Sequence, residues 1–475
     1  MSKTLKKLFK NTHLLRALLA TLILFIPLYP KFPLSSVTGT YVAIRLDDIV
    51  VALALFFLLL DQIKNRFSLL KKPISKLFIA YFIAIITSNI LALLIYKIDP
   101  KNILILHLLR RFEYMSLFFL TVQAIKDKKD LKVPAISLLI STFLVSLYGL
   151  GQKYLSFPVV STMNSEFSKG QLLQLDTWTR ISSTFAGHYD LAAFLSVALV
   201  IIFGLFLLSK KSYQKIPILL VWILGFYILT LTASRVSTFA FWGGITLSLI
   251  LIRKYLWILP TSALMVFSIF NSADLNQRLI ATIGTIKLPK TVQPTPIPTA
   301  IPTPTTPAIK PTKGPVAIIS TPIPTVVRHG PIDEFIPVDV DAGVARSGEI
   351  RFNAEWPRAL TAFSKNRLNG SGLGSITLAT DNDYLRLLGE SGLLGFLTFL
   401  AIPVFFLISS TKDIFVKKQN HFHKYKLILA ASLITMMANA TLIDVFEASK
   451  TAYLFWIMMG VYYQILIFSK NDKSN

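Results

Sequence analysis

Long apolar runs separated by short polar stretches dominate this chain and predict helices that cross a membrane. Segments 191–209, 216–234 and 391–411 contain no charged residue. Each approaches the roughly 20 residues that a helix needs to span the hydrocarbon core of a bilayer. Similar runs recur, so we predict an all-α polytopic membrane protein with about twelve transmembrane helices. The expected spans are 13–30, 46–62, 76–96, 103–125, 134–152, 188–208, 215–232, 235–252, 255–270, 391–410, 425–442 and 450–469.

The basic residues between these runs predict how the chain is oriented. Lysines and arginines gather before the first span and after every second span, at 3–10, 64–72, 126–132, 210–215, 253–254, 412–424 and 470–473. The intervening short loops hold fewer, such as Lys97 and Lys101. Because Lys and Arg accumulate in cytoplasmic loops, we expect a multi-pass plasma-membrane (inner-membrane) protein with both termini in the cytoplasm.

The chain divides into two membrane regions around one long outer loop. Residues 1–270 form an N-terminal bundle of about nine spans, and 391–475 add about three. The extracytoplasmic loop 271–390 contains a stretch dense in Pro and Thr, 288–327, which is expected to be extended and disordered. Its part 346–390 is expected to be ordered and helical.

Within that ordered part, the apolar side chains repeat at helical spacing. Trp356, Leu360 and Phe363 lie on one face of a predicted helix. Pro357 suits the first turn of a helix because its missing N–H has no partner there anyway. We therefore start this helix near Asn353.

Composition narrows the possible functions. Only 15% of residues are charged, against roughly 25% in a typical soluble domain, and the mean hydropathy is +0.60. The net charge of +25 is distributed between apolar spans, which argues against nucleic-acid binding. The absence of cysteine excludes disulfides and thiolate metal sites. No Gly-rich phosphate loop followed by Lys and Ser or Thr occurs, and we expect no cofactor and no metal.

The fourth span carries ionisable residues, which are costly at membrane depth and suggest function. His107, Arg111 and Tyr114 share one helix face. One interpretation is the wall of an anion-binding cavity that contains Arg111. The other is a structural brace inside the bundle, with an ion pair between Arg110 and Glu113.

Two arginines lie at the outer ends of spans. Arg235 follows Ser234 at the predicted start of a helix, which Ser234 or Thr232 can cap. A cation at a helix N-terminus is electrostatically unfavourable unless an anion such as phosphate lies beside it. Arg180 precedes the sixth span and is followed by His188. For each, the alternative is an interfacial anchor or a satisfied polar group.

A polar cluster precedes the tenth span. Carboxylates at Asp381 and Asp383, with Asn382 between them, are expected at the top of a helix, where capping and the helix dipole explain them. Those effects do not explain Tyr384 or Glu390 beside them. Upstream, a Gly-Ser-Gly-Leu-Gly turn at 370–374 lets backbone approach a ligand or forms a plain loop.

Four short motifs occur in order around the outer ends of the spans. They are an Arg-x-x-x-x-Phe element (Arg180 to Phe185), a Ser-Arg turn (Ser234-Arg235), an Arg and a Trp before a Gly-x-Gly-x-Gly turn (Arg351, Trp356, Gly370 to Gly374), and a polar-Asn-x-Tyr-Leu element running into Glu-x-Gly-x-x-Gly (Asp381 to Gly395). Over residues 40–465 the chain thereby resembles the bacterial O-antigen ligase and polymerase superfamily.

The resemblance implies a GT-C-like membrane glycosyltransferase. Such an enzyme transfers a glycan from a polyprenyl-diphosphate donor to a hydroxyl of a glycan, lipid or protein acceptor outside the cytoplasm. Its arginines hold the diphosphate, a role we assign to Arg235 with Arg180 or Arg351. Ligases of the superfamily use a His in a His-Asn-x-x-Leu element, where this chain has Asp381, so Asp381 is the expected base.

The remaining site residues follow from the same motifs. Asp383, His188 and Glu390 are alternative bases. The residues expected to bind substrate are Arg351, Arg111, His188, Trp356, Asn382, Tyr384 and Glu390. A transporter or flippase for a lipid-linked oligosaccharide is the second function considered, although the halves show no internal repeat. A structural anchor for the Pro/Thr segment is the third.

Overall fold

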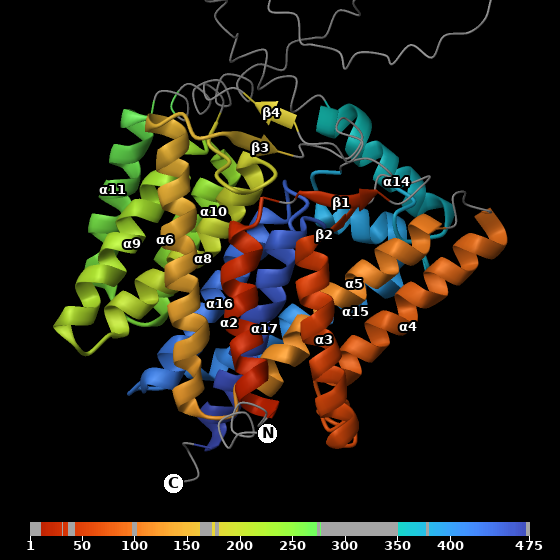
Figure 1. Cartoon of the computed structure of the whole chain (residues 1–475), viewed down its shortest axis with the longest axis horizontal. Helices are drawn as coiled ribbons and strands as arrows, with labels where there is room; N and C mark the ends of the chain where they lie inside the picture. The colour runs from red at the N-terminus through yellow and green to blue at the C-terminus, as the bar shows by residue number, and fades with distance from the viewer. Residues whose placement is uncertain are drawn as a thin grey trace, which may run out of the picture.

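The computed structural model describes residues 11–30, 32–36, 43–96, 102–161, 173–175, 180–272, 276, 350–376 and 380–471. In this part the chain forms an α-helical bundle with two small β-hairpins (Figure 1). The predicted Pro/Thr segment 288–327 lies outside the described residues.

Each predicted span coincides with a helix. The helices are α2 (Asn11–Leu28), α3 (Leu46–Lys64), α4 (Ser75–Leu91) with the π-helix η1 (Ala92–Tyr96), α5 (Asn102–Ala124), α6 (Lys132–Tyr154), α8 (His188–Leu208), α9 (Ser212–Leu231), α10 (Arg235–Leu251), α11 (Ile258–Asn271), α15 (Asp383–Ile414), α16 (His421–Asn439) and α17 (Ser449–Asn471). Short turns of 3-10 helix, η2 (Lys128–Leu131) and η3 (Tyr255–Trp257), lead into α6 and α11.

Six of these helices are long and apolar enough to cross a membrane: α4 with η1, α6 with η2, α8, α9, α15 and α17. The apolar helices α2, α10 and α11 are shorter. Helices α3 and α5 are long enough to cross a membrane but include ionisable residues such as Asp47 and Arg111. The described part therefore has the architecture of an all-α, multi-pass membrane protein.

The first and last helices of the described part are antiparallel. Lys450, in the first turn of α17, donates a hydrogen bond to the carbonyl of Pro27 near the end of α2, at 2.9 Å. Consequently α2 begins and α17 ends at the same end of the bundle (Figure 1). We call this the inner end, and the opposite one the outer end.

Two hairpins that the sequence did not predict lie at the outer end (Figure 1). Strand β1 (Pro33–Ser36) pairs antiparallel with β2 (Ala43–Arg45), and β3 (Val159–Ser161) with β4 (Leu173–Leu175). Strands of three or four residues are too short for an alternating pattern to stand out from a loop.

The predicted amphipathic helix also lies at the outer end. It comprises the π-helix η4 (Arg351–Glu355) and α14 (Trp356–Lys365), so it begins two residues before the predicted Asn353. Helix α14 packs against α15. In the interior, α17 packs against α5, α16 and α2, and its Trp456 ring lies 5.4 Å from Phe78 and 6.1 Å from Phe399.

Helix α15 is broken near the boundary at which the sequence placed the start of the tenth span. Gly392 has φ 63 and ψ −168, so Asp383–Ser391 and Leu393–Ile414 are two helices joined at a kink. The Gly-rich turn fills the break: Ser371 and Gly372 donate backbone hydrogen bonds to the carbonyls of Gly389 and Glu390, at 2.9 and 2.8 Å. The turn thus allows close approach to the backbone of α15.

Candidate functional site

Three arginines from separate segments come together at the outer end of the bundle. Arg180 precedes α8, Arg235 begins α10 and Arg351 begins η4. The charges of Arg180 and Arg351 both act on the guanidinium of Arg235, as does the hydroxyl of Tyr189. We call Arg180, Arg235 and Arg351 the arginine cluster. Like charges repel, so an anion bound beside Arg235 would offset the repulsion from the other two arginines.

Arg235 is held by a rigid turn. Ala233 has a positive φ of 50, and Thr232, Ala233 and Ser234 are all buried. The Ser234 hydroxyl donates to the Ser237 hydroxyl at 3.2 Å, and no side chain caps the first N–H groups of α10, contrary to the predicted cap. The partial positive charge of this helix end is therefore added to that of the guanidinium.

Arg180 precedes a buried segment that hydrogen bonds hold in place. Ser183 exchanges hydrogen bonds with the side-chain amide of Gln152, at 2.8 and 3.0 Å. The buried ammonium of Lys450 donates to the carbonyl of Thr184 at 2.8 Å and lies 4.6 Å from the ring centre of Phe185. Arg180 itself is hydrogen-bonded to His188 at 2.7 Å.

Arg351 brings the expected base into the cluster. Its Nε and Nη2 donate to Oδ2 of Asp381 at 3.0 and 2.8 Å. The carboxyl of Asp381 is 34% exposed, so a hydroxyl from solution can reach it. Burial and the nearby Asp444 carboxylate raise the pKa of Asp381, although Arg351 lowers it.

The backbone of Asp381 is clamped by Asp444, which lies in the turn between α16 and α17. Its two carboxylate oxygens accept hydrogen bonds from the N–H groups of Thr380 (2.9 Å) and Asn382 (3.0 Å). The clamp holds Asp381 at a φ of 49, a conformation that non-glycine residues rarely adopt. Asp444 is therefore a positioning residue for Asp381.

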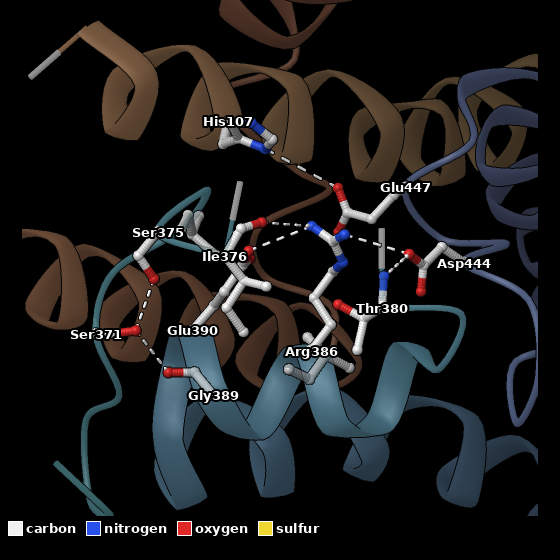
Figure 2. Close-up of polar contacts among 12 residues, drawn as sticks. His107, Ser371, Ser375, Ile376, Thr380, Arg386, Gly389, Glu390, Asp444 and Glu447 are labelled. Atoms are coloured by element: carbon white, nitrogen blue, oxygen red, sulfur yellow. Dashed lines mark hydrogen bonds and ion pairs between the residues drawn. The ribbon is translucent and has the colours of Figure 1, made fainter. Parts of the chain in front are cut away.

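Arg386 connects this clamp to the broken helix (Figure 2). Its Nη2 donates to Asp444 at 3.2 Å, and its Nη1 to Glu390 and to the carbonyl of Ile376, both at 3.4 Å. Asp383 is buried and accepts a hydrogen bond from the N–H of Phe446 at 3.1 Å. The turn before α17 is thereby fixed against the first half of α15.

Arg111 belongs to the same buried network and not to the arginine cluster. Its guanidinium is 5% exposed and forms an ion pair with Glu447, while His107 lies 4.0 Å from the same carboxylate. Burial raises the pKa of Glu447, but the charges of Arg111 and Arg386 outweigh it and lower the pKa to about 2. The predicted open anion cavity at Arg111 is therefore wrong, because a carboxylate already occupies it.

The Glu113 carboxylate of the predicted Arg110–Glu113 brace has a further partner in the structure. The hydrogen bond to the Glu113 carboxylate comes from Tyr453, at 2.6 Å. Arg110 and Glu113 interact through their charges. Tyr453 lies on α17 and Glu113 on α5, so this pair joins two packed helices.

Several predicted substrate-binding residues have structural contacts. The side chain of Asn382 caps α15 by accepting from the N–H groups of residues 384 and 385, and the Tyr384 hydroxyl donates to the Met437 carbonyl at 2.7 Å. Glu390 is buried and forms an ion pair with Arg386. Trp356 is half-buried, packs edge-on against Phe352 at 4.7 Å, and has a buried indole N–H with no hydrogen-bond partner among the described residues.

Sequence reasoning missed four residues around the site: Glu355, Asp444, Glu447 and Lys450. Burial and the charge of Asp381 raise the pKa of Glu355 to about 7. Two of these residues could have been found from the sequence. Asp444 and Glu447 lie in the short outer turn between two apolar spans, where carboxylates need cationic partners. In the described part of the chain, no group of His, Asp or Glu is arranged to hold a metal ion.

Comparisons with known proteins leave the family open. No protein-family model matches this sequence, and no curated protein is significantly similar to it.

Proposed function

We propose that this protein is a glycosyltransferase of the O-antigen ligase and polymerase type, acting at the outer end of its helical bundle. It would transfer a glycan from a polyprenyl-diphosphate donor to an acceptor hydroxyl. The observation that carries the proposal is the convergence of Arg180, Arg235 and Arg351 with Asp381 bonded to the last of them. The twelve helices then cross the membrane with both termini in the cytoplasm, as the lysine-rich inner loops favour.

A diphosphate matches the charge of the cluster. Three guanidinium groups come from separate segments, and the charges of Arg180 and Arg351 act on Arg235. Guanidinium groups bind phosphate oxygens with paired hydrogen bonds. The uncapped start of α10 supplies further N–H donors for an anion.

The proposed reaction balances without any other reactant. The acceptor oxygen forms a bond to the anomeric carbon of the donor glycan, while the bond from that carbon to the diphosphate oxygen breaks. The acceptor proton passes to Asp381. The polyprenyl diphosphate leaves with the bonding electrons, and Arg180 and Arg235 stabilise its developing negative charge.

A transfer assay tests the proposal. Purified protein in detergent is mixed with a lipid-linked glycan and an acceptor glycan, and the products are separated by size. Arg235→Ala and Asp381→Asn should each lower the transfer rate by about a hundredfold or more while the protein stays folded. Arg66→Ala, at an exposed position near the inner end, is the matched control and should retain full activity. Full activity in both site variants would refute the roles given to them.

One observation favours a transporter or flippase instead. Helix α15 is discontinuous at Gly392 and carries Asp383, Arg386 and Glu390 just before the break. Discontinuous helices with polar side chains at the break are typical of transporters. Transfer measured in detergent needs no second compartment, so product formation there supports the enzyme. Movement of the lipid across sealed vesicles without any product would support the transporter.

A further inference from the structure

A long apolar cavity runs through the bundle away from the arginine cluster. Its volume is about 400 Å³, within the usual range for ligand pockets. Side chains of α2, α6, α8, α16 and α17 line it, and nearly all are apolar. Protein interiors seldom contain voids larger than a few water molecules, and an apolar void does not hold water.

The shape of the cavity fits a hydrocarbon chain. On α17 it extends from Thr451 to Ile465, and on α16 from Phe422 to Met436. At 1.5 Å per residue each stretch is about 21 Å long. This is roughly two thirds of the ~30 Å hydrocarbon thickness of a bilayer, and more than a compact soluble ligand requires.

The two ends of the cavity differ in charge. At the inner end, Lys128 and Lys132 line the mouth, and the Lys128 ammonium lies 4.9 Å from the ring centre of Phe422. At the outer end, Thr451 and Phe194 line the cavity beside Lys450. The Lys450 ammonium is directed at the carbonyls of Pro27 and Thr184. Among the described residues, the charged side chains that line the cavity are Lys128 and Lys132, so an anionic headgroup fits at the inner mouth.

We propose that this cavity binds one acyl chain of an anionic glycerophospholipid from the leaflet at the inner end, with its phosphate at Lys128 and Lys132. Membrane lipids are the most abundant amphiphiles available to a bundle in a bilayer, and a cytoplasmic leaflet is rich in anionic ones. The acyl chain fills the void between α8, α16 and α17. The bound lipid is distinct from the proposed diphosphate substrate, which meets the protein at the other end of the bundle.

Lipid binding by delipidated full-length protein tests the proposal. The protein is titrated in detergent with phosphatidylglycerol and with phosphatidylcholine, and native mass spectrometry counts the bound lipids. Wild-type protein should retain one phosphatidylglycerol in preference to phosphatidylcholine. Lys128→Gln/Lys132→Gln should lower that preference about twenty-five-fold, because each of the two lysines near an anionic headgroup contributes roughly fivefold. Lys129→Gln, exposed in the same turn but not lining the cavity, should leave it unchanged.

A second variant tests whether the acyl chain of the lipid binds in the cavity. Val197→Trp fills the cavity and should abolish retention of the lipid, whereas Ile408→Trp, on an exposed face of α15, should not. Equal binding of both lipids by wild-type protein, or an unchanged preference in the double lysine variant, would overturn the proposal. So would tighter binding of a polyprenyl phosphate than of phosphatidylglycerol. None of these outcomes depends on transfer activity, so failure here leaves the proposed glycosyltransferase untouched.

Discussion

The arginines near the outer end of this bundle occupy two environments that differ in charge balance. In the buried network, Arg111 is paired with Glu447, and Arg386 with Asp444 and Glu390. In the arginine cluster, the charges of Arg180 and Arg351 act on Arg235, and Arg351 forms an ion pair with Asp381. Each guanidinium of the network is paired with a carboxylate, whereas the cluster holds three guanidinium groups and the partly exposed carboxylate of Asp381.

This difference separates a structural from a functional use of the same side chain. A buried charge is tolerated when carboxylates and hydrogen bonds offset the loss of water. The network meets that condition and fixes the turn that carries Asp444. In the cluster, the charges of Arg180 and Arg351 act on Arg235, which is partly exposed, as binding of an anionic substrate requires. Four substitutions test whether the network and the cluster differ in this way.

The largest expected effect is on stability, from Arg386→Ala. Removing this guanidinium leaves Asp444 and Glu390 without their cation in a buried site. The free energy of unfolding should fall by about 3–5 kcal/mol, measured by thermal unfolding in detergent. Arg235→Ala should change it far less. Equal stability of the two variants would remove the distinction between network and cluster.

Gly392→Ala tests the break in α15 on which the network depends. An added Cβ would lie 2.5 Å from the backbone of Gly370 and Leu368, at a φ of 63 that disfavours any side chain. We expect a loss of about 3 kcal/mol from strain and crowding. Gly243→Ala, in α10, meets no atom within 4 Å and serves as the control. Wild-type stability of Gly392→Ala would mean that the helix is continuous.

The sequence predicted the helices better than it predicted their irregularities. Apolar runs locate each helix because burial in lipid demands a continuous stretch of a fixed length. The break at Gly392 was not predicted, because the run 391–411 is apolar across it. The kink is fixed by contacts with the segment 367–370, such as the hydrogen bond from the N–H of Leu393 to the carbonyl of Arg367 at 2.8 Å, and the local pattern does not reveal them.

Local sequence pattern was also insufficient to predict the contacts within the candidate site. Motifs identified Arg180, Arg235 and Asp381, since an arginine or a carboxylate at a span end is conspicuous. They could not separate Arg111 from these, because its partner Glu447 lies more than 300 residues away along the chain. Partners so distant in sequence are supplied by folding and not by local pattern.

Asp444→Asn examines the link between the two regions. It weakens the clamp on Asp381, so kcat for transfer should fall roughly tenfold to hundredfold with little change in KM. Because the Asp444 charge raises the pKa of Asp381, its removal should also shift the acid limb of the pH–rate profile to lower pH. A purely structural Asp444 would change stability and leave that limb in place.

The smallest effect is expected from Glu355→Gln. Burial and Asp381 raise the pKa of Glu355 to about 7, so the folded protein binds this proton more tightly than the unfolded chain does. Wild-type stability should therefore fall as the pH rises from the ordinary glutamate range toward 7, and the glutamine variant should escape that fall. Parallel melting temperatures of the two proteins at pH 5 and pH 8 would contradict the raised pKa.

The central claim, that the arginine cluster binds a lipid diphosphate, is tested most directly by measuring that affinity. Purified wild-type protein and Arg235→Ala are titrated with a fluorescent polyprenyl diphosphate and, separately, with the matching polyprenol. Wild-type protein should bind the diphosphate more tightly than the polyprenol, and Arg235→Ala should lose roughly tenfold to a hundredfold of the diphosphate affinity. Equal affinities for the two lipids, or an unchanged affinity in Arg235→Ala, would contradict the account.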